Sequence, residues 1–524
     1  MLFSSATFVY FFLPVFLISV IISIRFFNAS STEWVILAAS TIFYCSYNLP
    51  YSSLLICSII FNFIIGQKIY KSLLNKQSVE AKWLLRLGVG TNILAICYFK
   101  YSNFFIENVN YIFKSNISLL EILLPLGISF FTFQQIAYLV DVHRGNNPEP
   151  TLKRYAIFVS FFPQLIAGPI VHHKHFLAQL EKNFTKNWNL NYLICGLSIF
   201  LIGLFKKVVI ADNIGKVADA VFNAADEGKT MVFLESWFGA LSYAFQIYFD
   251  FSAYSDMAIG LGLMIGIMLP INFNSPYKST SIIEFWRLWH ITLSSFLKNY
   301  LYIPLGGNKF GSFNRYKNLM IVMFLGGLWH GSGWNFAIWG CLHGFYLCIN
   351  HFWRHSRFAN PDPNFIYKLF SWFLTMFFIV IAWVFFRAET FDGAIEMIRA
   401  MLLLSEDLRL VIPFSFEAKA IFENSLLGEF TSPGLIVQNV HILDGHWPYV
   451  KYAILSCGII CLFMPNTLHV FRLYISQSCK NNLEVEQTRF NWQPSLRWGI
   501  FIGIITTSSL MMLAGSTEFI YFEF

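Results

Sequence analysis

Charged residues are scarce in this sequence of 524 residues: only 12% are Asp, Glu, Lys or Arg, 56% are hydrophobic, and the mean hydropathy is +0.56. A soluble domain has about 25% charged residues. The hydrophobic residues form many long runs, and about 20 apolar residues make a helix that spans a bilayer. The run lengths and the absence of polar–apolar alternation exclude a transmembrane β-barrel. The sequence therefore predicts an all-α, polytopic integral membrane protein.

The sequence also lacks the short motifs of several enzyme classes: it has no P-loop, no dinucleotide-binding glycine fingerprint, no HExxH zinc motif and no GxSxG nucleophile elbow. The nine cysteines contain no CxxC pair, so we interpret them as small core residues. His172, His173 and His175 lack the i, i+4 spacing of a helical metal site, and we interpret them as a cytoplasmic surface. We therefore expect no bound metal and no bound cofactor.

Basic residues lie in short loops rather than in one stripe, so the net charge of +7 predicts no nucleic-acid partner. Instead these loops indicate topology. The basic segment 67–86 predicts a cytoplasmic loop and thereby a periplasmic N-terminus and an outer C-terminus. The hydrophobic runs predict about 11–13 membrane elements, within a single domain over residues 1–524. The short run 155–171, with basic residues on both sides, predicts a re-entrant or interfacial element, and the acidic segment 388–448 an outer-side, non-membrane segment.

Titratable side chains inside the hydrophobic runs are the candidate functional residues, because such groups are expensive to place at membrane depth. His330 lies in the glycine-rich stretch GGLWHGSGW, His343 follows in the same run, and His290 lies in EFWRLWHITL. A neutral imidazole suits a general base that works near neutral pH. A packed structural histidine is the alternative at each position, and it is the interpretation that we favour for His343.

Two carboxylates, Asp250 and Asp256, lie in YFDFSAYSDMAIGLG. They either cap a helix at the interface or form the polar wall of a buried cavity, with Arg287 as a candidate partner. Glu284, Arg287 and His290 are spaced i, i+3 and i+6, which on one helix would bring neighbouring members together. That segment is either an amphipathic interfacial helix or a helix that carries His290 towards the cavity.

Five segments of the sequence, taken in their order along the chain, resemble the membrane-bound O-acyltransferase family, and within it most closely the alginate O-acetylase branch. The resemblance rests on DFSAYSDMAIGLG, NFNSPYKSTSIIEFWRLWHITLSSFLKNYLYIPLGGNK, GGLWHGSGWNFAIWGCLHG, WVFFRAET and MPNT. The strong motifs define a catalytic motif region over residues 250–390. One departure is visible: Leu288 stands where relatives often carry a second arginine.

This resemblance implies a ring of tilted helices around a central tunnel, with acetyl-CoA as a donor substrate that enters from the cytoplasm. It implies that His330 is the catalytic base and that His290 is a second active-site residue. The residues that we expect to line the tunnel are Asp250, Asp256, Asn274, Arg287 and Trp329.

The implied acceptor is an exported polysaccharide, with alginate favoured over cellulose or peptidoglycan. We expect transfer at the outer face of a bacterial inner membrane, through a separate periplasmic acetyltransferase partner. Two other classes remain open: a transporter or channel with a buried His/Asp relay, and a structural scaffold for polymer secretion.

Overall fold

The computed structural model describes residues 1–47, 49–183, 190–354, 356, 364–404, 447–471, 491–515, 517 and 519–520. Every regular element in these residues is helical, which confirms the all-α class. The elements are η1 (Phe8–Phe12), α1 (Leu13–Phe26), α2 (Ala29–Cys45), α3 (Leu49–Leu74), α4 (Ser78–Ile96), η2 (Cys97–Tyr101), α5 (Ser102–Phe113), α6 (Ile128–His143), α7 (Leu152–Ser160), α8 (Phe162–Leu165), α9 (His173–Asn183), α10 (Leu190–Phe205), η3 (Lys206–Ala211), α11 (Asp212–Asp226), α12 (Phe233–Met264), η4 (Pro276–Lys278), α13 (Ile282–Leu288), α14 (Ile291–Leu297), η5 (Lys298–Tyr302), α15 (Gly311–His330), α16 (Trp334–Arg354), α17 (Phe365–Arg387), α18 (Phe391–Met401), α20 (Trp447–Phe463), α22 (Leu496–Met512) and η7 (Leu513–Gly515).

Five helical stretches in the described residues are long and apolar enough to cross a bilayer: Phe8–Phe26, Leu49–Leu74, Leu190–Asp226, Phe365–Arg387 and Leu496–Gly515. Their outward faces carry exposed aromatic side chains such as Phe11 and Phe370, which a bilayer covers at no cost. The remaining helices are shorter or more polar. The chain is thus a polytopic membrane protein, as predicted.

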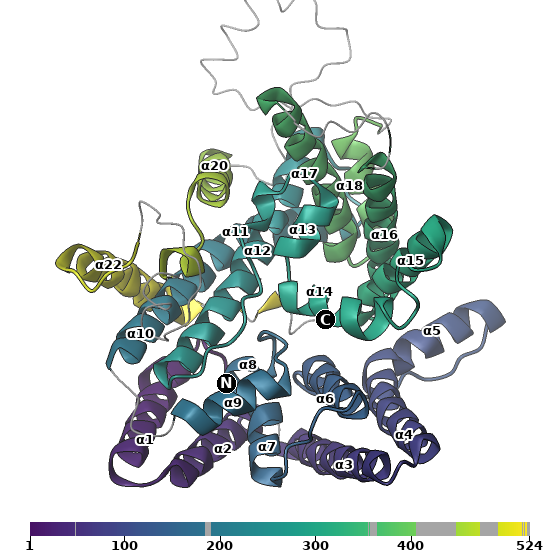
Figure 1. Cartoon of the computed structure of the whole chain (residues 1–524). Helices are drawn as coiled ribbons and strands as arrows, with labels where there is room; N and C mark the ends of the chain where they lie inside the picture. The colour runs from purple at the N-terminus through teal and green to yellow at the C-terminus, as the bar shows by residue number, and fades with distance from the viewer. Residues whose placement is uncertain are drawn as a thin grey trace, which may run out of the picture.

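The helices form a ring around buried elements (Figure 1). α1 to α4 follow one edge, α10, α20 and α22 a second, and α15 to α18 a third, while α6, α8 and α14 lie between them. α12 is buried at every residue from Ile247 to Met264. It crosses α10 at Gly196 and Gly260, where a Cβ on either residue would lie 2.6 Å from the carbonyl oxygen of the other. Small residues allow this close approach of two helices in a membrane protein.

The segment from α7 to the start of α9 doubles back on itself. α7 ends at Ser160, and Phe161 leaves the helical conformation with ψ 105° before the single turn of α8. Tyr138 of α6 contacts the rings of both Tyr155, at 4.6 Å, and His173, at 5.2 Å. The two ends of the segment therefore lie on the same side of the molecule, as a re-entrant hairpin does.

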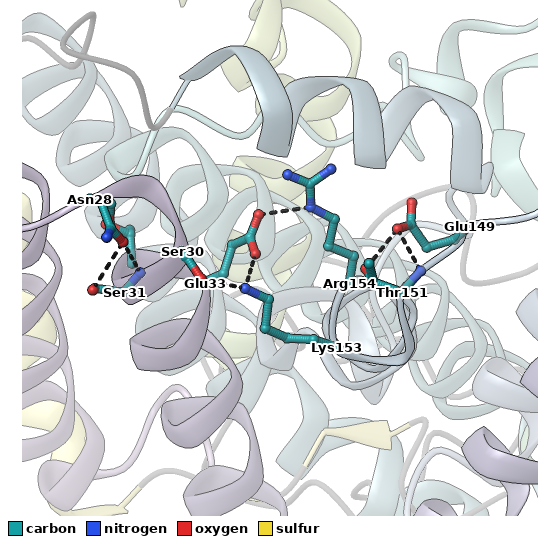
Figure 2. Close-up of polar contacts among 9 residues, drawn as sticks. Asn28, Ser30, Ser31, Glu33, Glu149, Thr151, Lys153 and Arg154 are labelled. Carbon is teal, nitrogen blue, oxygen red and sulfur yellow. Dashed lines mark hydrogen bonds and ion pairs between the residues drawn. The ribbon is translucent and has the colours of Figure 1, made fainter.

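A buried carboxylate attaches this hairpin to α2 (Figure 2). The Glu33 carboxylate lies 2.5 Å from Lys153 Nζ and accepts a hydrogen bond from Arg154 Nε at 2.9 Å. Glu33 is 2% exposed, whereas the side chains of Lys153 and Arg154 are 19% and 32% exposed. The basic residues that mark topology in the sequence thus also neutralise a buried negative charge.

Beyond α17, the first part of the predicted outer-side segment forms the helix α18, whose inward face buries Ala394, Met397 and Ala400. Most of the predicted outer-side segment, residues 405–446, lies outside the described residues.

Replacing Glu33 with Gln is expected to lower the free energy of unfolding by on the order of 2 kcal/mol, because two cations lose their buried counter-charge. Partial exposure of both cations keeps the loss below that of a fully buried pair. The measurement is the melting temperature of detergent-purified protein, with Glu80→Gln at the exposed start of α4 as control. Equal melting temperatures for both variants would show that the triad contributes no stability.

Candidate active site

His330 is the last residue of α15 and is 4% exposed. The chain leaves the helix at Gly331 in an extended conformation. Three rings surround the imidazole: Trp329, Trp339 of α16 and Phe386 of α17, with centroids at 4.9, 5.1 and 5.1 Å. Three helices therefore hold His330 in a largely apolar pocket from which bulk water is excluded.

Glycines bring α15 and α16 together beside this pocket. A Cβ on Gly327 would lie 2.3 Å from the Phe336 carbonyl oxygen, and a Cβ on Gly340 would lie 2.3 Å from that of Met323. At Gly326 the nearest atom would be 3.4 Å away, in the side chain of Leu297. Close helix packing thus accounts for Gly327, one of the glycines of the GGLWHGSGW stretch.

His290 lies between α13 and α14 and is fully buried, with φ +41°. A left-handed conformation is uncommon for a residue other than glycine, and such residues cluster at functional sites. The expected helical series of Glu284, Arg287 and His290 is wrong, because α13 ends at Leu288. Glu284 instead accepts hydrogen bonds from the backbone and hydroxyl of Thr280, before the helix start.

A buried amide fixes the turn that holds His290. The backbone carbonyl of Asn272 accepts a hydrogen bond from Ile291 N at 2.9 Å, and its side chain accepts one from the Thr292 hydroxyl at 2.6 Å. The Thr292 hydroxyl in turn accepts from Ile170 N of the re-entrant hairpin at 3.0 Å. The hairpin and α14 are therefore joined immediately beside His290.

Trp329 connects the two histidines. Its ring centroid lies 4.9 Å from that of His330 and 6.2 Å from that of His290. Phe251 of α12 packs edge-on against His290 at 4.7 Å. The structure thus brings together three of the residues singled out in the sequence, although more than 35 positions separate His290 from the other two in the chain. His343 packs as expected: it is fully buried, and its Nδ1 accepts from Trp286 Nε1 at 3.3 Å.

The predicted tunnel carboxylates have other partners. Asp250 lies 2.7 Å from Lys207 Nζ, and Asp256 lies 2.7 Å from Lys206 Nζ, both on η3. Asp250 also accepts from Ile520 N at 3.0 Å. The predicted pairing with Arg287 is therefore wrong. The lysines of η3 neutralise both carboxylates, and the arginine of the later EFWRLWHITL motif does not.

Two residues near the C-terminus pack against the same region of α12. Phe519 and Ile520 are 1% and 7% exposed, and Phe519 packs against Tyr254 of α12 at 5.0 Å. These residues are therefore packed into the helix bundle beside the Asp250 ion pair, and the outer position of the C-terminus stays a prediction.

Two further predicted tunnel residues are exposed side chains. Arg287 is exposed on α13. Asn274 is also exposed, and its Oδ1 accepts a hydrogen bond from Asn466 Nδ2 at 2.8 Å. Asn274 therefore connects two of the motifs that the sequence placed far apart. The buried asparagine beside His290 is Asn272, which nothing in the pattern NFNS distinguishes from Asn274.

A cavity of about 880 Å³, here called the α14 cavity, begins one residue beyond His290. It is lined by Ile291, Thr292, Ser295, His172, His175, Gln179, Asn299 and Tyr300, among others. The interpretation of the histidine tract as a surface holds for His172 and His175, which are exposed, but not for His173, which is 3% exposed.

A second cavity of about 250 Å³, here called the Gly331 cavity, begins one residue beyond His330. Its lining includes Lys100, Ser102, Asn103, Ile122, Leu124, Gly331, Ser332 and Phe336. Lys100 and the polar residues beside it were missed in the sequence. A lysine that directly follows the apolar run of α4 is the signal that could have identified it.

The two cavities lie towards opposite ends of α6. Tyr300 of the α14 cavity donates a hydrogen bond to Asp141, near the end of α6, at 2.9 Å. Ile122 and Leu124 of the Gly331 cavity precede the start of α6. A helix of 16 residues is about 24 Å long. The histidines and Trp329 therefore lie between two cavities that approach from opposite directions.

Most of this chain is similar in sequence to known proteins. The family model described as the membrane-bound O-acyltransferase family matches residues 146–388, which include both histidines. The chain is 44% identical to the peptidoglycan O-acetyltransferase of Helicobacter pylori, over 77% of this chain and 80% of the relative. It is 42% identical to a probable alginate O-acetylase of Azotobacter vinelandii, over 76% of this chain and 78% of the relative. A teichoic acid D-alanyltransferase of Streptococcus thermophilus is 31% identical over 45% of this chain and 59% of the relative.

Gly327→Ala is expected to destabilise the protein by about 1–3 kcal/mol, because the added methyl group overpacks a backbone contact. Gly326→Ala is the matched control, since its methyl group meets only ordinary contact. Thermal unfolding of the two purified variants measures the difference. A Gly327→Ala protein as stable as Gly326→Ala would contradict the role of close α15–α16 packing.

Proposed function

Because the chain belongs to the membrane-bound O-acyltransferase family, we propose that it moves an acetyl group from cytoplasmic acetyl-CoA to a hydroxyl group at the outer face of the membrane. Acyl transfer is the activity of the family, so the transporter and scaffold alternatives are set aside. The observation that carries the finer proposal is the position of His290, Trp329 and His330 between two cavities at opposite ends of α6.

In the proposed reaction, the imidazole of His330 takes the proton from the acceptor hydroxyl as the oxygen attacks the thioester carbonyl carbon. The carbon–sulfur bond breaks, and the imidazolium returns the proton to the sulfur. Coenzyme A therefore leaves as the thiol. No covalent enzyme intermediate is required. The aromatic surroundings of His330 exclude water, which protects the thioester from hydrolysis. His290 orients the acceptor or stabilises the developing charge.

The α14 cavity is the proposed donor site. Arg144 donates a hydrogen bond to the Asn299 carbonyl at 3.0 Å, at the rim of this cavity. Lys174, beside the exposed His175, adds a second cation nearby in the chain. Cations at a cavity mouth raise the local concentration of an anionic ligand such as coenzyme A. By the positive-inside rule this end of the molecule is cytoplasmic, which gives a bacterial inner-membrane protein with a periplasmic N-terminus.

The Gly331 cavity is the proposed acceptor side. Its volume of about 250 Å³ is below the roughly 300–1,000 Å³ of most small-molecule pockets. A single hydroxyl-bearing side chain fits such a space better than a polymer does. We therefore propose that the acetyl group first passes to a periplasmic acetyltransferase partner, which then modifies the polymer.

The final acceptor in this proposal is a hydroxyl group of an exported glycan. Alginate was favoured from the motifs, and the relatives include a peptidoglycan enzyme and a probable alginate enzyme at 44% and 42% identity. This difference is too small to separate the two polymers, so the proposal names the chemistry that they share. Mass spectrometry of acetylated sugars from cells with and without the gene identifies which polymer is modified.

His330→Ala is expected to reduce acetyl transfer by at least about 10²-fold, since a positioned general base contributes about 10²–10⁴-fold. His290→Ala is expected to give a smaller loss. Thioester consumption and acceptor labelling are measured with purified variants of equal melting temperature, and His351→Ala at the far end of α16 serves as control. Full turnover by a folded His330→Ala protein would refute the assignment of the base.

A further inference from the structure

The end of α15 is held by side chains from η2, which lies outside the part of the chain that matches the family model. Lys100 Nζ donates hydrogen bonds to the carbonyl oxygens of Trp329 at 2.6 Å and His330 at 2.9 Å. The hydroxyl of Tyr101 donates to the carbonyl oxygen of Leu328. The last three carbonyls of the helix that carries His330 therefore all accept hydrogen bonds from two consecutive residues.

These contacts answer a general need of helices. The last four carbonyl groups of an α-helix have no partner within the helix. They also carry the negative end of the helix dipole, equivalent to about half an elementary charge, which favours a cation there. Lys100 satisfies both requirements, and it does so at the residue that the proposed function identifies as the base.

Lys100 is a buried lysine whose counter-charge is not a carboxylate. Lys100 is 8% exposed, and among the described residues no carboxylate lies within ion-pair distance of it. By contrast, the half-buried Lys206 and the buried Lys207 each pair with an aspartate on α12 at 2.7 Å. Burying an ammonium group without a carboxylate is costly, and a cation at such depth is a functional candidate by default. The end of α15 is the negative group that compensates Lys100.

We propose that Lys100 is a positioning residue for His330. By fixing the carbonyls of Trp329 and His330, its ammonium group fixes the backbone that carries the imidazole. Lys100 also lines the Gly331 cavity, together with Gly331, the residue that follows His330. Tyr101 fixes the carbonyl of Leu328, one residue earlier in α15, in the same way. The proposal rests on the proposed function for the role of His330 as the base, but the hydrogen bonds from Lys100 do not depend on it. The catalytic role and the positioning role are therefore tested by separate measurements.

The kinetic test uses four variants. Lys100→Met removes the ammonium group at similar length, Lys100→Arg keeps a cation and its donors, and Tyr101→Phe removes one hydrogen bond. Lys114→Met, at an exposed lysine that directly follows α5, controls for loss of a lysine. A misplacement of about 1 Å can cost about 10²-fold in rate. We expect kcat to fall by about 10²-fold in Lys100→Met, less in Tyr101→Phe and least in Lys100→Arg. KM for acetyl-CoA should not change, since the donor site is the α14 cavity.

A second readout does not depend on turnover. Diethyl pyrocarbonate modifies accessible imidazoles, and peptide mass spectrometry gives the extent of modification at His330 alone. His330 is 4% exposed, so slow labelling is expected in the wild-type protein. Lys100→Met should label several-fold faster because the helix end is released, and Lys100→Arg should return towards the wild-type rate.

The outcomes separate the two proposals. If His330 is labelled faster in Lys100→Met, but the wild-type protein transfers no acetyl group, the proposed function is refuted and the positioning role is kept. Wild-type kcat and wild-type labelling in Lys100→Met would overturn the positioning role. A lower yield of folded protein with unchanged kcat per folded molecule, or no rescue by arginine, would overturn it too. If Lys100→Met does not fold, Lys100→Gln, which keeps one pair of donors, is judged by the same criteria.

Discussion

The cost of placing charge in an apolar interior determines how this protein is built. Each buried charged group described above has a compensating group from another element. Glu33 holds the re-entrant hairpin through Lys153 and Arg154, and the aspartates of α12 hold η3 through two lysines. Lys100 holds the end of α15 through its carbonyls. These contacts join parts of the chain that hydrophobic packing, which is non-directional, would leave free to slide.

The candidate active site depends on those attachments. His290 lies at a left-handed turn that Asn272, Thr292 and the hairpin backbone fix together, and His330 lies at a helix end fixed by η2. Trp329 packs between them. Because neither histidine is in mid-helix, each can lie next to a cavity without breaking a membrane-spanning helix. This geometry supports a reaction in which donor and acceptor arrive from opposite directions and meet at the imidazoles.

Much of this could be predicted from the sequence, because hydrophobic run length and the expense of intramembrane histidines are one-dimensional signals. The all-α membrane class, the doubled-back segment near 155–171 and the packing of His343 followed from them. Pairing in three dimensions could not be predicted. Nothing in the sequence shows that Lys206 and Lys207, rather than Arg287, face the aspartates. Spacing also suggested one helix through His290, whereas the loop at Asn272 ends that helix two residues earlier.

The most direct test of the account is the direction of transfer. Sealed membrane vesicles of both orientations, carrying wild-type protein or His330→Ala, receive labelled acetyl-CoA outside, and label on the periplasmic-face acceptor is quantified by mass spectrometry. The account predicts labelling only when the donor meets the face that carries the α14 cavity, and none in His330→Ala. Equal labelling with donor at either face would contradict transfer through a site between the two cavities.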